Sequence, residues 1–338
     1  MPNLTTRTIA LAACSALIAC GTEAPRQSRA APIDSVRTTP APIDTAATAN
    51  APATPTTDAA LPASDSTGKV PVLMYHVIGD HDALWTVERG RFRRQLETLH
   101  ARGYRPITVA QLIDRDFRDV PRGYKPVVFT FDDASPSQFR YLVRGDSLVV
   151  DPTSAVGIWL DFARTRPDWK PRATFCLLSG AEAGRSFFGN KGIEGQQDAW
   201  RFRKVQWLHA QGFELCNHTL WHATLGKYPD AVVQEQIARG QLAIDSAVPG
   251  YRVRTFALPL GVWPKNRPLA WAGSWTDPKT GTVTRYAHDA VLEVAGGPSV
   301  SPFDPTFAPR SIKRFVVTGE SLERLVRRLD SVGGVFVR

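Results

Sequence analysis

The chain has 338 residues, of which 43% are hydrophobic, and carries a formal net charge of +9. This length suffices for one large domain or two modest ones, with a sizeable core. The basic residues are dispersed and form no stripe interleaved with aromatic residues, which argues against a nucleic-acid partner. The basic residues are expected to lie on solvated helix faces, and attraction to an anionic polymer is the alternative.

The first 20 residues are typical of an export signal. Arg7 precedes an apolar run over 9–19, which is too short to span a bilayer as a helix. The run ends in "LIAC", which resembles the lipobox of bacterial lipoproteins, where the Cys is lipid-modified and becomes the first mature residue. We therefore expect a lipoprotein signal peptide over 1–20 with lipidation at Cys20. Cys14 is a rival site, and a plain cleaved signal peptide is the alternative.

The next segment, 21–68, is rich in Ala, Thr, Pro and Ser and has few large apolar residues. Such a composition cannot bury enough surface to offset the entropy lost on ordering, so it predicts a disordered tether. A lipid anchor followed by a long flexible arm would let an exported, membrane-attached domain of the bacterial envelope reach a polymer. The anchor is the only membrane contact that we expect.

From residue 69 to 338, segments with strand-like and helix-like patterns alternate. This alternation predicts a single α/β domain with a parallel sheet or barrel, whose chemistry gathers at the carboxyl ends of the strands. The expected strands cover 70–78, 126–133, 172–178, 213–218, 254–261, a segment within 286–297 and a terminal strand over 334–338. The expected helices cover 90–103, 154–167, 199–212, 231–246 and 321–332.

Two polar groups follow expected strands. Asp132 and Asp133 end the run "PVVFTFDD", and His218 and His222 lie in "ELCNHTLWH". Neither pair is specific by itself. Together, two imidazoles and one carboxylate make three metal ligands with an open position, the composition of a catalytic zinc site. Since consecutive strand residues face opposite sides, one Asp must lie beyond the regular strand if both serve one site.

The ordered motifs "TFDD" and "HTLWH", with "PVLMYHVI" near the domain start, resemble the polysaccharide deacetylases of the NodB-homology group, carbohydrate esterase family 4. The resemblance covers 69–338. It implies a distorted (β/α) barrel, usually seven-stranded, and metal-dependent removal of acetyl groups from N-acetylated sugars. By motif match, Asp132 is the general base, whereas Asp133, His218 and His222 hold a divalent metal, with Zn²⁺ as the expected ion.

The chain departs from the family pattern in its third motif, usually Arg-x-Pro-Tyr followed by Gly. The matching stretch is "ALPLG", so Ala257 replaces the Arg that normally orients the catalytic Asp, and Leu260 replaces the Tyr. The support for the catalytic Asp is then either missing or supplied by another group, such as Arg310 or Lys313. The backbone N–H of Leu260 can still stabilise an oxyanion, because that role needs no side chain.

A second departure concerns the general acid. The family commonly places a His after an apolar run in its last motif, but "GVFVR" contains none. His288 is the nearest late candidate, although a lone loop His is more often incidental. His76 is expected to be a core or supporting group. Trp221 is expected either to wall the pocket or to pack in the core.

Two further cysteines, Cys176 and Cys216, fall in strand-like runs. An exported compartment permits a disulfide between them. Two separate buried thiols are the preferred expectation, because the sequence does not give their separation.

These features predict an anchored, metal-dependent deacetylase acting on an N-acetylglucosamine-containing polysaccharide of the envelope or matrix. In one alternative, the same site on the same fold hydrolyses another non-peptide amide. The other is a catalytically inactive carbohydrate-binding relative. The complete set of two Asp and two His residues favours an enzyme, since a binding module has no need of a metal-activated water.

Overall fold

The computed structural model describes residues 67–181 and 186–338. The expected signal peptide over 1–20, the lipidation site Cys20 and nearly all of the expected tether over 21–68 therefore lie outside the described residues and stay predictions. Within the described ranges, no helix combines the length and hydropathy that a membrane span requires.

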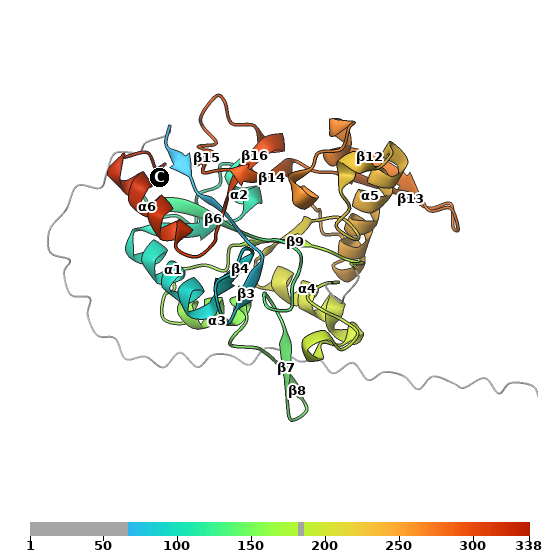
Figure 1. Cartoon of the computed structure of the whole chain (residues 1–338), viewed down its shortest axis with the longest axis horizontal. Coiled ribbons are helices and arrows are strands. Elements are labelled where there is room, and N and C mark those ends of the chain that lie inside the picture. Colours follow the sequence, from blue (N-terminus) through green and yellow to red (C-terminus); the bar gives the residue numbers. More distant parts are fainter. Residues whose placement is uncertain (1–66, 182–185) are drawn as a thin grey trace, which may run out of the picture. The chain divides into compact units, whose positions relative to one another are not determined.

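Seven parallel strands close into a barrel (Figure 1). The ring closes where the first strand pairs with both the second and the last. This confirms the expected (β/α) barrel. An eighth strand, β5 (Tyr104–Ile107), pairs with the first half of the second barrel strand, outside the ring. The barrel strands, in order around the ring, are β2 (Val72–Tyr75), β6 (Lys125–Phe131), β9 (Thr174–Leu177), β10 (Glu214–Asn217), β11 (Thr255–Ala257), β14 (Ala290–Gly296) and β16 (Ile312–Val316).

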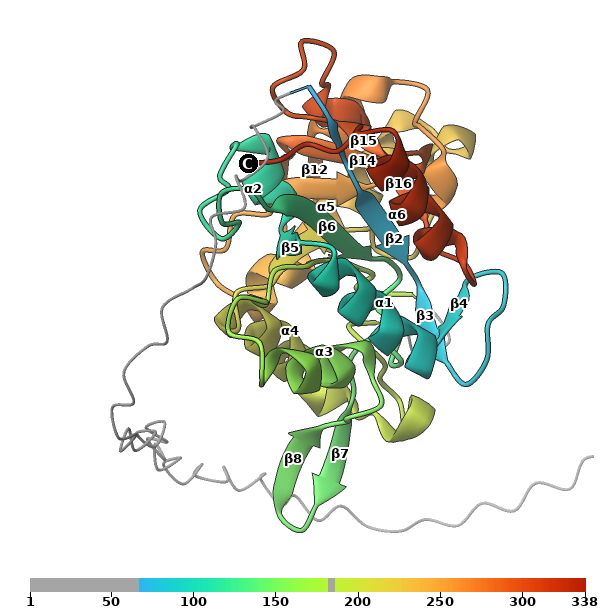
Figure 2. The ribbon, with the colours of Figure 1, turned by 90° about the vertical axis from the view of Figure 1, so that its left-hand side faces the viewer.

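Helices pack around the outside of the barrel (Figure 2). The first of them begins after Glu88, whose carboxylate accepts hydrogen bonds from the first backbone N–H groups of the helix. It ends before Gly103, whose φ of 77° suits a glycine. The helices are α1 (Arg89–Ala101), α2 (Val109–Ile113), α3 (Ala155–Ala163), α4 (Arg201–Ala210), α5 (Asp230–Ala247) and α6 (Ser321–Ser331).

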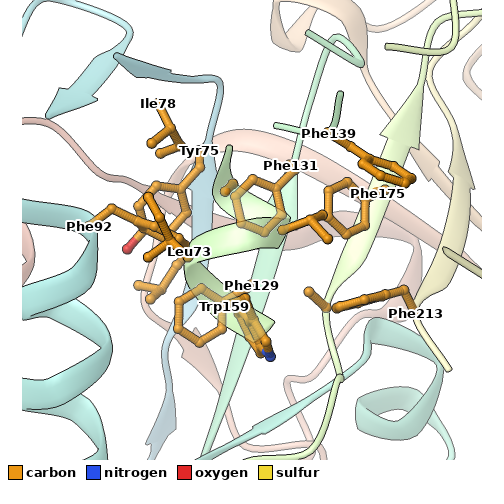
Figure 3. Packing of buried hydrophobic residues seen from close by; sticks show 14 of the residues in the cluster. Leu73, Tyr75, Ile78, Phe92, Phe129, Phe131, Phe139, Trp159, Phe175 and Phe213 are labelled. Atoms are coloured by element: carbon orange, nitrogen blue, oxygen red, sulfur yellow. The ribbon is translucent and has the colours of Figure 1, made fainter. Parts of the chain in front are cut away.

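The main core lies between the barrel wall and the surrounding helices and is rich in aromatic rings (Figure 3). Alternate residues of β2, β6, β9 and β10 point outward into it, whereas Phe256 of β11 and Val291 of β14 belong to a separate cluster with α5. Phe131 of β6 stacks on Phe175 of β9 with centroids 4.8 Å apart, and Tyr75 of β2 stacks on Phe131. This packing fixes the register of the strands whose carboxyl ends carry the site.

The inward-facing residues fill the barrel itself. Cys176 and Cys216 are direct partners in the parallel pairing of β9 and β10, and they form a disulfide. The preference for two separate thiols was therefore wrong. Register explains the difference, because two cysteines in register on adjacent strands, both facing the barrel interior, are brought within bonding distance.

The C-terminal part differs most from expectation. The segment 334–338 was expected to be a strand, but it forms only isolated bridge contacts, including one between Val335 and Lys69. The seventh barrel strand is instead β16, which the sequence patterns did not predict.

Short strands and two hairpins complete the fold. The hairpin of β7 and β8 projects from the body of the domain (Figure 2), and that of β12 and β13 packs on α5. These strands are β1 (Lys69–Val70), β3 (Val77–Gly79), β4 (Thr86–Glu88), β7 (Tyr141–Arg144), β8 (Ser147–Val150), β12 (Ala272–Thr276), β13 (Val283–Ala287) and β15 (Ser299–Val300).

Candidate active site

Asp132 and Asp133 directly follow β6, and their backbone conformations differ. Asp132 extends the strand, donating its backbone N–H to the carbonyl of Tyr75 at 3.0 Å, and it points into the barrel. Asp133 has a φ of 75°, which turns it out of the strand. Both carboxylates therefore reach the same end of the barrel, and the expectation that one Asp lies beyond the regular strand is confirmed.

The two histidines lie in the loop after β10. Asn217 holds this loop by donating to the carbonyl of Ile237 at 2.9 Å and accepting from the N–H of Thr219 at 2.9 Å. Helix α5 approaches closely through Gly240, where a Cβ would lie 2.4 Å from the Asn217 Oδ1. A side chain at Gly240 would thus push the histidine loop away from the helix.

His218 has a defined tautomer. Its Nδ1 lies 2.9 Å from the carbonyl oxygen of Ala257, which can only accept a hydrogen bond. Nδ1 therefore carries a proton, and Nε2, 3.4 Å from the Asp133 Oδ1, is the ring nitrogen that faces the cluster and would bind a metal in its deprotonated form. Orientation of a ligand imidazole by a backbone carbonyl is a common arrangement around protein-bound metals.

Asp133, His218 and His222 converge on one point. The Oδ1 of Asp133 lies 3.4 Å from the His218 Nε2 and 3.5 Å from the His222 Nε2. One ligand atom from each of the three residues lies within 4.8 Å of the others. Two of these atoms, Asp133 Oδ1 and His218 Nε2, are buried without a hydrogen-bond partner. Buried polar atoms rarely stay unpaired, so this donor set fits a metal ion.

The electrostatics of the cluster keep the acids ionised. Burial opposes ionisation, but the guanidinium of Arg314 and the imidazole of His218 hold the pKa of Asp132 below its usual value. The pKa of Asp133 is also well below its usual range, because the His218 imidazole outweighs burial. Burial, followed by the charge of His218, lowers the pKa of His222 to about 4. His222 is therefore neutral at neutral pH, the form in which an imidazole binds a metal.

A pocket of about 300 Å³ opens over these residues. His76, which was expected to be a supporting or core group, forms part of its wall, and its ring lies 4.8 Å from the ring of Trp85. Trp85 is 44% exposed at the mouth. Trp221 is not among the lining residues. The pocket is lined by His76, Val77, Trp85, Asp132, Asp133, Ser135, His218, His222, Leu258, Leu260 and Val294.

Arg314 of β16 provides the support for the Asp132 carboxylate that was expected to be missing or to come from another residue. Its guanidinium donates to both carboxylate oxygens of Asp132, at 2.8 and 2.7 Å. The two groups proposed for this contact lie elsewhere. Lys313 pairs with Glu293, and Arg310 lies over the ring of Trp271. In β16, Arg314 faces the barrel interior and its neighbour Lys313 faces outward, a difference that a predicted strand at 312–316 would have revealed.

Leu260 lies in a 3-10 turn, η4 (Pro259–Gly261), and lines the pocket. Its φ of 55° is unusual for a residue with a side chain. The role of its N–H at an oxyanion stays a prediction. His288 is buried against Phe256 and Tyr286 in the outer core beneath α5 and is not a lining residue, which agrees with an incidental role.

Left-handed backbone conformations concentrate around the pocket. Among the described residues, ten with side chains have a positive φ, and five of them follow the carboxyl ends of β6, β10 or β11. Such conformations are costly and persist where the surrounding structure enforces them, often at functional sites. These five residues are Asp133, Ala134, Thr219, His222 and Leu260.

The family model for polysaccharide deacetylases matches residues 169–271. The match includes both histidines of the cluster but not Asp132 or Asp133, whose place in the site rests on the geometry. A search of curated proteins found no match.

Solved structures share the fold. The Streptococcus pyogenes deacetylase PplD, in complex with acetate, is 18% identical with a TM-score of 0.53, over 77% of this chain and 98% of that one. A polysaccharide deacetylase from Bacillus cereus has the same identity and TM-score, over 77% and 69%. IcaB from Ammonifex degensii is 18% identical with a TM-score of 0.52, over 77% and 96%. The family match over 169–271 and the shared fold make this chain similar to the polysaccharide deacetylases.

Proposed function

We propose that this protein is a metal-dependent hydrolase that removes N-acetyl groups from an N-acetylglucosamine-containing polysaccharide of the cell envelope or matrix. The observation that carries the proposal is the convergence of Asp133, His218 and His222 beside a second, separately held carboxylate, Asp132, in one open pocket. The fold relative from Streptococcus pyogenes, a deacetylase whose structure holds acetate, supports acetate as the product.

In this proposal, Asp133 Oδ1 and the Nε2 atoms of His218 and His222 hold a divalent ion. Two nitrogens and one oxygen with an open position favour Zn²⁺. When bound, the ion supplies acidity to a water molecule, whose pKa falls to about 7. The carbonyl of Ala257 keeps the His218 imidazole in the tautomer that presents Nε2.

Asp132 is the proposed general base. It is buried at the pocket floor, its pKa is low, and it does not belong to the convergent ligand set. A carboxylate there accepts the proton of the attacking water as the water adds to the acetyl carbon. The backbone N–H of Leu260, which lines the same pocket, is the proposed donor to the oxygen that becomes negative.

His76 is the proposed proton donor to the departing amine. Among the described residues that line the pocket, it is the one titratable side chain besides the two aspartates and the two ligand imidazoles. Burial lowers the pKa of His76, and the charges of Asp132 and Asp133 act in the opposite direction. An imidazolium in this position would be a strong enough acid to protonate an amine as it leaves.

The walls of the pocket suit a sugar residue. Trp85 offers a half-exposed ring at the mouth, and aromatic faces pack well against the apolar faces of sugars. Val77, Leu258 and Val294 line the pocket with apolar surface that an acetyl methyl group could contact.

Export and anchoring through a lipidated Cys20 complete the proposal and place the domain near envelope polymers. Changing Cys20→Ser should release the protein from the membrane fraction or leave the precursor unprocessed. Normal membrane retention with full processing would contradict the proposed anchor and favour Cys14 or another attachment.

The test of activity is acetate release by the purified protein from acetylated chito-oligosaccharides, poly-N-acetylglucosamine and peptidoglycan. We expect release from at least one of them, its loss on metal chelation and its recovery on adding Zn²⁺. Glycan binding without acetate release from any substrate would contradict the proposal and favour an inactive carbohydrate-binding relative.

A further inference from the structure

We propose that Arg314 is the positioning residue of the catalytic base, acting from β16 in place of an Arg at position 257. This inference rests on the proposed function, because it concerns the orientation of Asp132 in the reaction. Arg314 is completely buried, and each of its three guanidinium nitrogens donates a hydrogen bond.

Two contacts fix the guanidinium independently of Asp132. Its Nε donates to the backbone carbonyl of Glu293 in the adjacent strand β14 at 2.6 Å. Its Nη1 donates to the hydroxyl of Thr130 in β6 at 3.0 Å. The plane of the guanidinium is therefore set by a neighbouring strand on one side and by β6 on the other.

The Asp132 carboxylate then takes its orientation from Arg314. Nη1 lies 2.8 Å from Oδ1 and Nη2 lies 2.7 Å from Oδ2, a bidentate pair. The rigid fork of Arg aligns a carboxylate in its own plane, whereas the single ammonium of Lys cannot. Thr130 is itself anchored, since its hydroxyl donates to the carbonyl of Leu73 at 2.8 Å.

The bidentate pair between Arg314 and Asp132, called the clamp below, separates the roles of Asp132 and Asp133. Both oxygens of Asp132 are engaged by Arg314, while Oδ1 of Asp133 has no hydrogen-bond partner and faces the imidazoles. Without the clamp, the Asp132 carboxylate would be free to rotate toward the ligand cluster. Arg314 thus holds Asp132 at a fixed angle to the proton that it must accept.

The experiment combines Arg314→Lys and Arg314→Gln with Asp132→Asn in a double-mutant cycle on acetate release. We expect Arg314→Lys to lower kcat by about 10²-fold, the cost of a catalytic group misplaced by about 1 Å. KM and bound metal should stay close to those of the wild type. Arg310→Lys, the same change at a residue that lies over Trp271, is the matched control and should change none of these quantities.

The cycle separates positioning from stability. If Arg314 acts through Asp132, adding Arg314→Lys to Asp132→Asn should cause no further loss of kcat, because the group being positioned is already inactive. A further loss of similar size in the double variant, or a kcat within threefold of the wild type for Arg314→Lys, would overturn the proposal. Arg314→Gln, which donates to one oxygen only, replaces Arg314→Lys if that variant does not fold. Failure of both to fold would make Arg314 a purely structural residue and also overturn it. A wild type that releases no acetate would refute the proposed function itself, a result distinct from all of these.

Discussion

The barrel encloses two buried carboxylates, Asp132 near its carboxyl end and Glu214 at its amino end, and their surroundings differ sharply. Asp132 pairs with a guanidinium and has a lowered pKa. Glu214 accepts hydrogen bonds from neutral groups only, and burial raises its pKa. The donors to Glu214 are the hydroxyls of Thr255 and Thr174, at 2.6 and 2.8 Å, and the backbone N–H of Ala110, at 3.0 Å.

The comparison shows that burial alone does not decide what a carboxylate does. Neutral donors satisfy Glu214 and close the amino end of the barrel, where no convergent ligand set lies among the described residues. A cation beside Asp132 keeps it charged, and the turn after it brings Asp133 to the imidazoles. Glu214 therefore contributes to stability at the amino end of the barrel, whereas Asp132 at the carboxyl end is the proposed catalytic group.

The largest effect should come from removing a proposed ligand. His218→Ala and His222→Ala each leave two protein ligands, which make a poor metal site. We expect bound metal to fall from one ion per chain to near zero, with loss of acetate release. His209→Ala, a change at a ring that packs on Tyr251, is the control. Retention of one tightly bound ion by both variants would show that the ligands lie elsewhere.

Much of this site could be predicted from the sequence. The paired motifs carry Asp132, Asp133, His218 and His222, and strands that end together bring them to one place. Arg314 could not be predicted, because "IKRFV" reads as a polar surface segment until its strand and its buried partner are known. Likewise, the Cys176–Cys216 disulfide depends on the register of β9 and β10, which no local pattern supplies.

A smaller loss of activity should follow from His76→Gln, which removes the proposed proton donor. General-acid assistance typically contributes about 10²–10⁴-fold, so deacetylation of N-acetylated sugars should slow by that order while the metal is retained. An activated aryl acetate, whose leaving group needs no proton, should be hydrolysed at nearly the wild-type rate. Equal losses on both substrates would show that His76 does not act as the acid.

The disulfide should affect stability more than chemistry. Replacing both partners, Cys176→Ala with Cys216→Ala, should lower the free energy of unfolding by about 2–4 kcal/mol. Denaturant unfolding of the oxidised wild type and the double variant measures this difference directly. An unchanged unfolding midpoint would mean that the bond does not constrain the chain in solution.

The smallest effect concerns Glu214 and depends on pH. Its folded pKa lies above the unfolded value, so it favours folding most below the unfolded pKa, and this contribution is lost as pH rises through the folded pKa. Each unit between the two pKa values is worth about 1.4 kcal/mol. Glu214→Gln should abolish this loss, so the stability of the variant relative to the wild type should increase as pH rises from about 4. A stability difference between variant and wild type that does not change with pH would show that folding does not raise the pKa of Glu214.

Asp132 provides the most direct test of the central claim, that a separately held carboxylate acts beside a bound metal. Asp132→Asn nearly preserves the shape of the side chain and removes the proton acceptor. The account predicts that the purified variant keeps its bound Zn²⁺ and its affinity for substrate, while acetate release slows by about 10²–10⁴-fold. Release of acetate at nearly the wild-type rate by the metal-loaded variant would contradict it.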